Sequence, residues 1–386
     1  ATLSVIQEVV NDLNLDLYEI DINNPNFEND QKAYNLLQRA LSNGVFQVES
    51  SGMKDLLLRL KPENLEDLSA VLALYRPDSM AMLEDYIHYK HNPSQIKYWH
   101  EDMESILNKT YGCIIYQEEI MDIVRVFGGR TYGGADKFRK GIGKKDKELV
   151  KQESNKLYEE IIENNYAKFL AKQISDYLAL MGGYSFNKSH SALYAVICLQ
   201  TAYLKSHYPA HFFKALFNQN KNDYGALNKY IIDSKQFGVE VLPPHINKSA
   251  NNFKVDNSKI LFGLGAIKGI GEKFVSEIIA ERIKGKFENF QDFVQRLNPS
   301  TSQVVILVKS GAIPTQNKRQ YLINYAHSLF EQKEYKPVSS LPKLEELKNR
   351  WGIDHEQVKD KTERLNLYNQ KRKIEFNKQQ DQKYNK

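Results

Sequence analysis

Apolar side chains recur at three- and four-residue spacing in several long segments of this chain, a period typical of α-helices that bury one face. The segment 114–127, IIYQEEIMDIVRVF, shows this period clearly. Further helices are predicted near the N-terminus and in the segments 30–40, 55–60, 63–74, 148–163, 167–181 and 189–207. Residues 17–22 are predicted to be extended. We therefore predict a mainly α-helical protein.

Length and composition restrict the class of protein further. The 386 residues are 41% hydrophobic, which indicates two or three domains with real cores. The two cysteines, Cys113 and Cys198, are too few for a disulfide framework or a thiolate-rich zinc site. No apolar run is long enough to span a membrane, and no basic leader is visible. We expect a cytoplasmic protein with no membrane partner.

A basic segment follows the 114–127 helix. Within eleven residues it carries Lys137, Arg139, Lys140, Lys144, Lys145 and Lys147. Gly141 and Gly143 lie between these charges, and glycines let the backbone approach a bound group closely. Cations beside exposed N–H groups suit phosphate. The alternative is a solvated basic helix face, and the segment alone does not decide between the two.

The segment 182–195, GGYSFNKSHSALYA, predicts the start of the 189–207 helix, with Ser189 as its N-cap. The first turn of a helix carries unpaired N–H groups and a partial positive charge. Lys188 and His190 beside that turn would complete an anion site. An ordinary capped helix with a structural His190 is the alternative.

The segment 264–278, LGAIKGIGEKFVSEI, has the pattern of a helix-hairpin-helix motif. A tight turn at Gly269–Gly271 joins two predicted helical pieces within 260–283. The motif has apolar residues at Leu264, Ile267, Ile270, Phe274 and Ile278, and a small apolar pair would pack its two helices together. Its glycines would let backbone N–H groups face a DNA phosphate. A plain αα-turn is the rival interpretation.

Carboxylates offer no clear metal site. Glu19 and Asp21 lie on one face of the extended piece, but no third carboxylate is predicted near them. Glu118, Glu119 and Asp122 are assigned to a helix surface. The common phosphate-loop, zinc-protease and nucleophile-elbow motifs are absent from the sequence. The residues therefore indicate a helical protein that contacts phosphate, without a catalytic constellation.

Seven segments, taken in order, resemble one family. They are VFQVESSGMKDLL (45–57), ALYRPDSM (73–80), TYGCIIYQEEIMDI (110–123), TYGGADKFRKGIGKK (131–145), GGYSFNKSHSALYAVICLQTAYLKSHYPAHF (182–212), VLPPHIN (241–247) and FGLGAIKGIGE (262–272). The chain is similar over residues 1–330 to the alpha subunit of bacterial DNA polymerase III, the C-family replicative DNA polymerases. Residues 331–386 match poorly.

The resemblance implies site residues. The incoming nucleotide's triphosphate would be bound by Arg139, Lys140, Lys144, Lys188, Ser189 and His190. The DNA duplex would be contacted by Lys268, Gly269, Gly271 and Lys273. The family usually has two arginines and an alanine where this chain has Arg139, Lys140 and Gly141, and a lysine cannot make a bidentate phosphate contact. Asp78 and Ser79 depart from the family's usual RPGP.

The resemblance also implies a domain order. Residues 1–45 would be the end of the palm and the entry to the fingers, 46–240 the fingers domain, 241–330 a small helix-hairpin-helix domain, and 331–386 a charged tail, helical or loosely ordered. The family's three metal-binding aspartates belong to the palm and are not in this chain. Its Mg²⁺ would therefore be held by palm residues outside this chain.

The sequence leaves three hypotheses about function. The first is the part of a DNA-directed DNA polymerase that binds dNTP and primer-template DNA while a palm-containing piece supplies the metal site; the chain alone would be inactive. The second is a non-catalytic module that binds DNA or a replisome partner. The third is a helical scaffold with a merely basic surface. Ser328–Phe330, SLF, resembles a sliding-clamp peptide, so the clamp and other replisome subunits are candidate partners.

Overall fold

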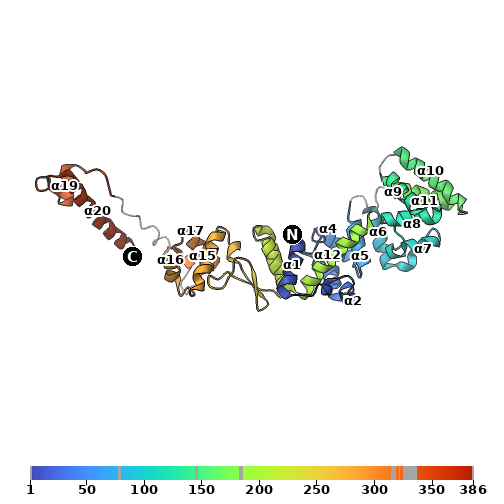
Figure 1. Cartoon of the computed structure of the whole chain (residues 1–386), viewed down its shortest axis with the longest axis horizontal. Helices are drawn as coiled ribbons and strands as arrows, with labels where there is room; N and C mark the ends of the chain where they lie inside the picture. The colour runs from blue at the N-terminus through green and yellow to red at the C-terminus, as the bar shows by residue number, and fades with distance from the viewer. Residues whose placement is uncertain are drawn as a thin grey trace. The chain divides into compact units, whose positions relative to one another are not determined.

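The computed structural model describes residues 2–76, 80–143, 147–181, 186–313, 319–320, 322–324 and 337–384. The protein is mainly helical, as predicted, with one small sheet (Figure 1). Two compact units are distinguished: residues 1–241 with 255–260, and residues 242–254 with 261–386. Asp78, Ser79, Lys144 and the segment 328–330 lie outside the described residues.

The first unit is built from helices joined by short loops. Its α-helices are α1 (Thr2–Leu13), α2 (Pro25–Glu28), α3 (Gln31–Gln38), α4 (Ser51–Leu60), α5 (Leu65–Leu74), α6 (Leu83–His91), α7 (Asp102–Leu107), α8 (Gln117–Gly128), α9 (Tyr132–Gly143), α10 (Lys147–Glu163), α11 (Lys168–Met181), α12 (Lys188–His207), α13 (Pro209–Gln219) and α14 (Tyr224–Gln236). Short 3₁₀ turns are η1 (Leu17–Ile20), η2 (Met80–Met82), η3 (Pro93–Gln95) and η4 (Asn108–Thr110).

Helix α12 is the centre of one core of this unit. It packs against α3, α5 and α13. Small and medium side chains along it, including Cys198, Leu199 and Ala202, are completely buried. Short side chains let neighbouring helices approach closely, and close packing brings the start of α12 beside α5.

Helices α7 to α11 form a second core in the same unit. Figure 1 shows α8, α9, α10 and α11 gathered together, in cyan and green. Apolar side chains from these helices share one buried cluster, which includes Ile120, Phe127, Phe138, Leu157 and Ile174. Helices α8 and α9 are consecutive, pack against each other and are joined by a short turn at Gly129, whose φ is +63°. Lys137, Arg139 and Lys140 of the basic segment are therefore carried on this helical hairpin.

The second unit contains α15 (Glu272–Ile283), α16 (Phe290–Leu297), α17 (Thr301–Ser310), α19 (Leu344–Trp351) and α20 (Lys361–Tyr384), with a 3₁₀ turn η5 (Leu264–Ala266). The five apolar positions predicted for the helix-hairpin-helix motif are all buried here, in one cluster with Val304, Leu307 and Val308 of α17. The apolar residues of the motif therefore pack together.

A three-stranded sheet has the order β1-β3-β2. Its strands are β1 (Val241–Leu242), β2 (Lys254–Asp256) and β3 (Lys259–Leu261). We predicted two helical pieces within residues 260–283. Residues 260 and 261 belong instead to strand β3, and the first helical piece is only the 3₁₀ turn η5. A segment this short gains few helical hydrogen bonds, so tertiary packing decides its conformation.

Two other local predictions are wrong. Residues 17–20 form the 3₁₀ turn η1 instead of an extended piece, because the Asp16 side chain accepts a hydrogen bond from the Tyr18 N–H and caps the turn. The helix predicted from residue 114 begins at Gln117. Residues 114–116 precede the helix, and Tyr116 has an extended backbone and pairs with Phe186.

None of the helices in the described ranges is both long enough and apolar enough to cross a membrane.

Candidate nucleotide-phosphate and DNA interface

Two cations of helix α9, Arg139 and Lys140, are held by a carboxylate of the same helix. Arg139 donates from Nε and Nη2 to Asp136 Oδ1 at 3.1 and 2.7 Å, and Lys140 Nζ lies 2.6 Å from Asp136 Oδ2. These hydrogen bonds, the one from Lys140 first, lower the pKa of Asp136 below its usual value. Spacings of three and four residues on a helix bring such side chains together. Both cations are therefore partly neutralised.

Arg139 also reaches across to the start of α8. Its Nη1 donates to Gln117 Oε1 at 2.9 Å. Gln117 is the first residue of α8, twenty-two positions earlier in the sequence. The guanidinium is consequently fixed at the open end of the α8–α9 hairpin, with its side chain only about one-quarter exposed.

The start of α12 meets the same end of α8. The Phe186 N–H donates to Ile115 O at 2.9 Å, and the Gln117 N–H donates to Phe186 O at 2.8 Å. The Lys188 N–H donates to Glu118 Oε2 at 3.0 Å. Gln117 thus contacts both the Arg139 side chain and the backbone just before α12. The structure brings Arg139 of the basic segment and the first residues of the FNKSHS segment together at the N-terminus of α8.

The N-cap of α12 is Asn187 and not Ser189. Asn187 has an extended backbone, and its Oδ1 accepts a hydrogen bond from the His190 N–H at 2.9 Å. Ser189 lies in the first helical turn and is exposed. The sequence offers two good caps two residues apart, and the pairing of Phe186 with Ile115 and Gln117 favours the earlier one.

The side chains of Lys188 and His190 have their own partners. Lys188 Nζ lies 3.3 Å from Glu66 Oε2 and 5.3 Å from the centre of the Tyr116 ring. The His190 ring packs against Tyr194 at 4.2 Å and Phe186 at 5.5 Å between centroids. The ammonium group therefore faces Glu66, while Arg139 faces Gln117 and Asp136. The segments converge, although these two cations point to different carboxylates.

Glu119 is buried, so the prediction that it lies on a helix surface is wrong. Its Oε2 accepts hydrogen bonds from the Ile115 and Tyr116 N–H groups at 2.7 and 2.9 Å. Burial outweighs these bonds and raises the pKa of Glu119 to about 7. Beside it, the Tyr116 hydroxyl donates to Ser69 Oγ, which in turn donates to Ser191 Oγ. This buried polar chain fixes α5, α8 and α12 relative to one another.

A cleft of about 680 Å³ lies in the same unit. Aromatic and polar side chains line it, among them Phe46, Tyr75, Arg76, Tyr194 and Tyr230. Tyr194 connects it to His190, against whose ring it packs. The Arg76 guanidinium lies 3.9 Å from the centre of the Phe186 ring, just before α12. Sequence reasoning missed Arg76, which occurs in a quoted motif but contacts its partner only through the tertiary fold.

In the second unit, the four residues proposed to contact DNA are exposed together at the start of α15. Lys268, Gly269, Gly271 and Lys273 all lie on the surface. Gly269 has a φ of +90°, and a Cβ there would come within 2.8 Å of Ile306 Cδ1, so the turn requires glycine. No side chain caps α15 at Gly271.

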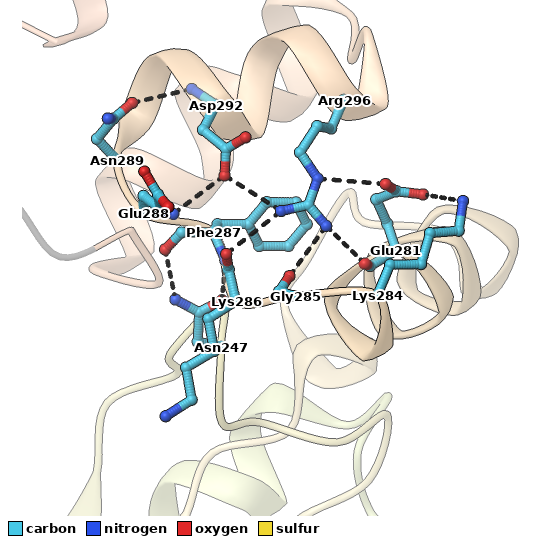
Figure 2. Close-up of polar contacts among 10 residues, drawn as sticks. All are labelled: Asn247, Glu281, Lys284, Gly285, Lys286, Phe287, Glu288, Asn289, Asp292 and Arg296. Atoms are coloured by element: carbon cyan, nitrogen blue, oxygen red, sulfur yellow. Dashed lines mark hydrogen bonds and ion pairs between the residues drawn. The ribbon is translucent and has the colours of Figure 1, made fainter.

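The opposite end of α15 is held by Arg296, which the sequence did not single out (Figure 2). Arg296 donates to the carbonyl oxygens of Glu281, Gly285 and Lys286 at 2.6, 2.9 and 3.3 Å. Its guanidinium lies 4.6 Å from the centre of the Phe287 ring.

Asn247 completes this support. Its Nδ2 donates to Phe287 O, and its Oδ1 accepts from the Phe287 N–H (Figure 2). The loop between α15 and α16 is thereby fixed by side chains on both sides. One turn of a helix rises about 5.4 Å, so this support lies some three turns from the Gly269–Gly271 hairpin and orients α15 without touching it.

Within the described ranges, no group of three or more histidine, cysteine, aspartate or glutamate side chains is arranged to hold a metal ion. Cys113 and Cys198 are both buried and unbridged. Burial raises the pKa of the Cys113 thiol to about 12, which makes it a poor metal ligand or nucleophile at neutral pH.

Comparison with known proteins identifies two regions of the chain, one in its first half and one that includes the helix-hairpin-helix segment. Residues 2–165 match the bacterial DNA polymerase III alpha subunit finger domain, and residues 238–321 match a helix-hairpin-helix motif. The chain is similar to the DNA polymerase III subunit alpha of Aquifex aeolicus, with 42% identity over 302 residues, 76% of this chain and 26% of that protein.

The corresponding subunit of Campylobacter jejuni is 40% identical over 293 residues, 74% of this chain and 24% of that protein. That of Bacillus subtilis is 38% identical over 299 residues, 76% of this chain and 27% of that protein. The chain thus aligns with about a quarter of the length of these relatives.

Proposed function

Because this chain carries the finger domain of a bacterial DNA polymerase III alpha subunit and a helix-hairpin-helix motif, we propose that it binds incoming dNTP and primer-template DNA during replicative DNA synthesis. The observation that carries the proposal is the junction at Gln117. There the Arg139 side chain and the backbone leading into α12 meet. These two elements come from the two segments in which phosphate ligands were predicted.

The proposed triphosphate site comprises Arg139, Lys140, Lys144, Lys188, Ser189 and His190. Arginine and lysine side chains make charge-assisted hydrogen bonds to phosphate, and the first turn of α12 adds backbone N–H groups. The present carboxylate partners, Asp136 and Glu66, hold the cations in place until phosphate replaces them. The adjacent cleft is large enough for a nucleoside.

Duplex contact is assigned to the second unit. Lys268, Gly269, Gly271 and Lys273 would bind the DNA backbone without reading its sequence, through ammonium groups and backbone N–H groups at the start of α15. We propose the same domain order as from the sequence: residues 1–45 as the end of the palm and the entry to the fingers, 46–240 as the fingers, 241–330 as the duplex-contacting helix-hairpin-helix domain and 331–386 as a charged tail.

Phosphoryl transfer by such a polymerase uses Mg²⁺ to stabilise charge on the reacting phosphate. We assign the Mg²⁺ ligands to palm residues, outside the finger and helix-hairpin-helix regions. The task of the present residues is to bind and orient the triphosphate and the primer-template. Nucleotide incorporation therefore requires a palm-containing polypeptide, which we propose as the partner of this chain.

Replacing Asp136 tests the phosphate site directly. In Asp136→Asn, Arg139 and Lys140 lose the carboxylate that competes with phosphate, so dATP binding measured by calorimetry should tighten by about 3- to 10-fold. Asp176→Asn on α11 is the matched control, because Asp176 also pairs with a lysine, Lys172, and the change in charge is the same. Equal effects of the two substitutions, or weaker binding by Asp136→Asn, would contradict the proposal.

A further inference from the structure

Helices α8 and α9 carry a second feature, at the closed end of their hairpin. The Arg125 guanidinium lies 3.4 Å from the centre of the Tyr132 ring, stacked on one face of it. Tyr132 is nevertheless 63% exposed. A large aromatic ring that leaves most of its surface in water has apolar area available for another flat group.

Arg125 is held in this position from the other side. Its Nη1 donates to Asp122 Oδ1 at 3.0 Å, one turn earlier on α8. Its Nε is enclosed by protein without a hydrogen-bond partner. The guanidinium is therefore held over the face of the tyrosine ring from one side, and the Asp122 carboxylate holds it from the other. We call Arg125 and Tyr132 the stacking pair.

The stacking pair and the proposed phosphate site share one helical hairpin. Tyr132 and Arg139 are seven residues apart on α9, which places them on the same helix face and about 10 Å apart along the axis. A DNA strand whose phosphate is bound by Arg139 could therefore extend along this face of α9 towards Tyr132. The backbone at Gly133 is open, since a Cβ built there meets nothing within 4 Å.

From this arrangement we propose that the stacking pair binds an unpaired base of single-stranded DNA, the overhang that precedes the duplex. Bases stack on exposed aromatic rings and on guanidinium planes whatever their sequence, and each stacked base contributes about 1–3 kcal/mol. Cations one or two nucleotides away suit the phosphates of the same strand. This inference rests on the proposed function and adds a site for the unpaired strand.

The test uses the full chain and two DNA probes: a primer-template with a single-stranded overhang containing 2-aminopurine, and the same duplex with blunt ends. Tyr132→Ala should weaken binding of the overhung DNA by about 5- to 50-fold and abolish the fluorescence change of 2-aminopurine. Binding of the blunt duplex should stay within about twofold. The slope of affinity against salt concentration should not change, because no phosphate contact is removed.

Tyr132→Phe is the matched control, because it keeps the ring and should bind like the unmodified chain. An unchanged thermal melting curve of Tyr132→Ala would establish that the variant is folded. Equal losses on both probes, no loss on either, or no preference of the unmodified chain for the overhang would each overturn the inference. Binding of dATP, which tests the proposed triphosphate site, should be unchanged in Tyr132→Ala. The dATP measurement can therefore contradict the triphosphate site, and the overhang measurement the site for the unpaired base, independently of each other.

Discussion

Lys205→Met is expected to lower the free energy of unfolding of the first unit by about 3–5 kcal/mol, because it leaves a buried carboxylate without its cation. Lys205 lies in α12 with its side chain completely buried, and its Nζ is 2.8 Å from Asp233 Oδ2, whose side chain is 3% exposed. The same ammonium donates to the carbonyl oxygens of Leu41 and Asn43 at 2.7 and 2.8 Å. One side chain therefore joins α12, α14 and the loop after α3.

Urea unfolding followed by circular dichroism measures this effect. The matched control is Lys229→Met, which removes a lysine paired with Glu49 on the surface, and whose side chain is 47% exposed. Exposed pairs contribute less than about 1 kcal/mol, so the control should remain near the stability of the unmodified chain. The double variant Lys205→Met with Asp233→Leu should recover part of the loss. A loss below about 1 kcal/mol in Lys205→Met would contradict this account of the core.

The same lysine predicts a pH dependence. Burial lowers the pKa of Lys205 to about 8, against its usual 10.5. Between these values the unfolded chain binds a proton that the folded chain has released, so stability contributed by this group increases as the pH rises from about 8 to 10.5. Lys205→Met should lack that increase.

Neutralising the cations of the proposed phosphate site should have the largest effect on ligand binding. The triple variant Arg139→Gln, Lys140→Gln and Lys188→Gln removes three described cations, at least one from each of the two converging segments. Charge-assisted hydrogen bonds to phosphate contribute more than neutral ones, and the loss of several corresponds to about a 100-fold or greater decrease in dATP affinity.

The control for this variant changes charge by the same amount elsewhere in the first unit. Lys151→Gln, Lys156→Gln and Lys172→Gln lie on α10 and α11, and all three lysines are exposed. The long-range attraction between the chain and dATP depends on the total charge, so both triple variants weaken it equally. The two variants differ only in whether side chains of the proposed phosphate site are removed. If the two variants lose dATP affinity equally, the proposed site is wrong.

Helical periodicity was enough to predict the mainly α-helical fold and most of its long helices. The period reports which face of a helix is buried, and it is a local property of the sequence. It failed at residues 17–20 and before α15, where segments are short and a single cap or neighbour decides the conformation. Helix starts were also imprecise, as at Asn187, because the choice between two possible caps depends on pairing with residues far away in the sequence.

Contacts across the fold could not be predicted in this way. The burial of Glu119, the stacking of Arg76 on Phe186 and the bond from Arg139 to Gln117 each join residues whose proximity arises only after the helices pack. Motif resemblance pointed to the two segments that we propose as the phosphate site. It did not reveal that the cations are already paired with carboxylates, which is what the Asp136→Asn experiment exploits.

The central claim is that α9 and the start of α12 bind one triphosphate together. A dATP analogue with an acyl group on its γ-phosphate tests it most directly, since a lysine amine close to the phosphate attacks the acyl carbon and displaces dATP. Mass spectrometry of the digested chain should find Lys140 and Lys188 acylated, and excess dATP should suppress both. Acylation of these two lysines no greater than that of the exposed Lys172, or no protection by dATP, would contradict the account.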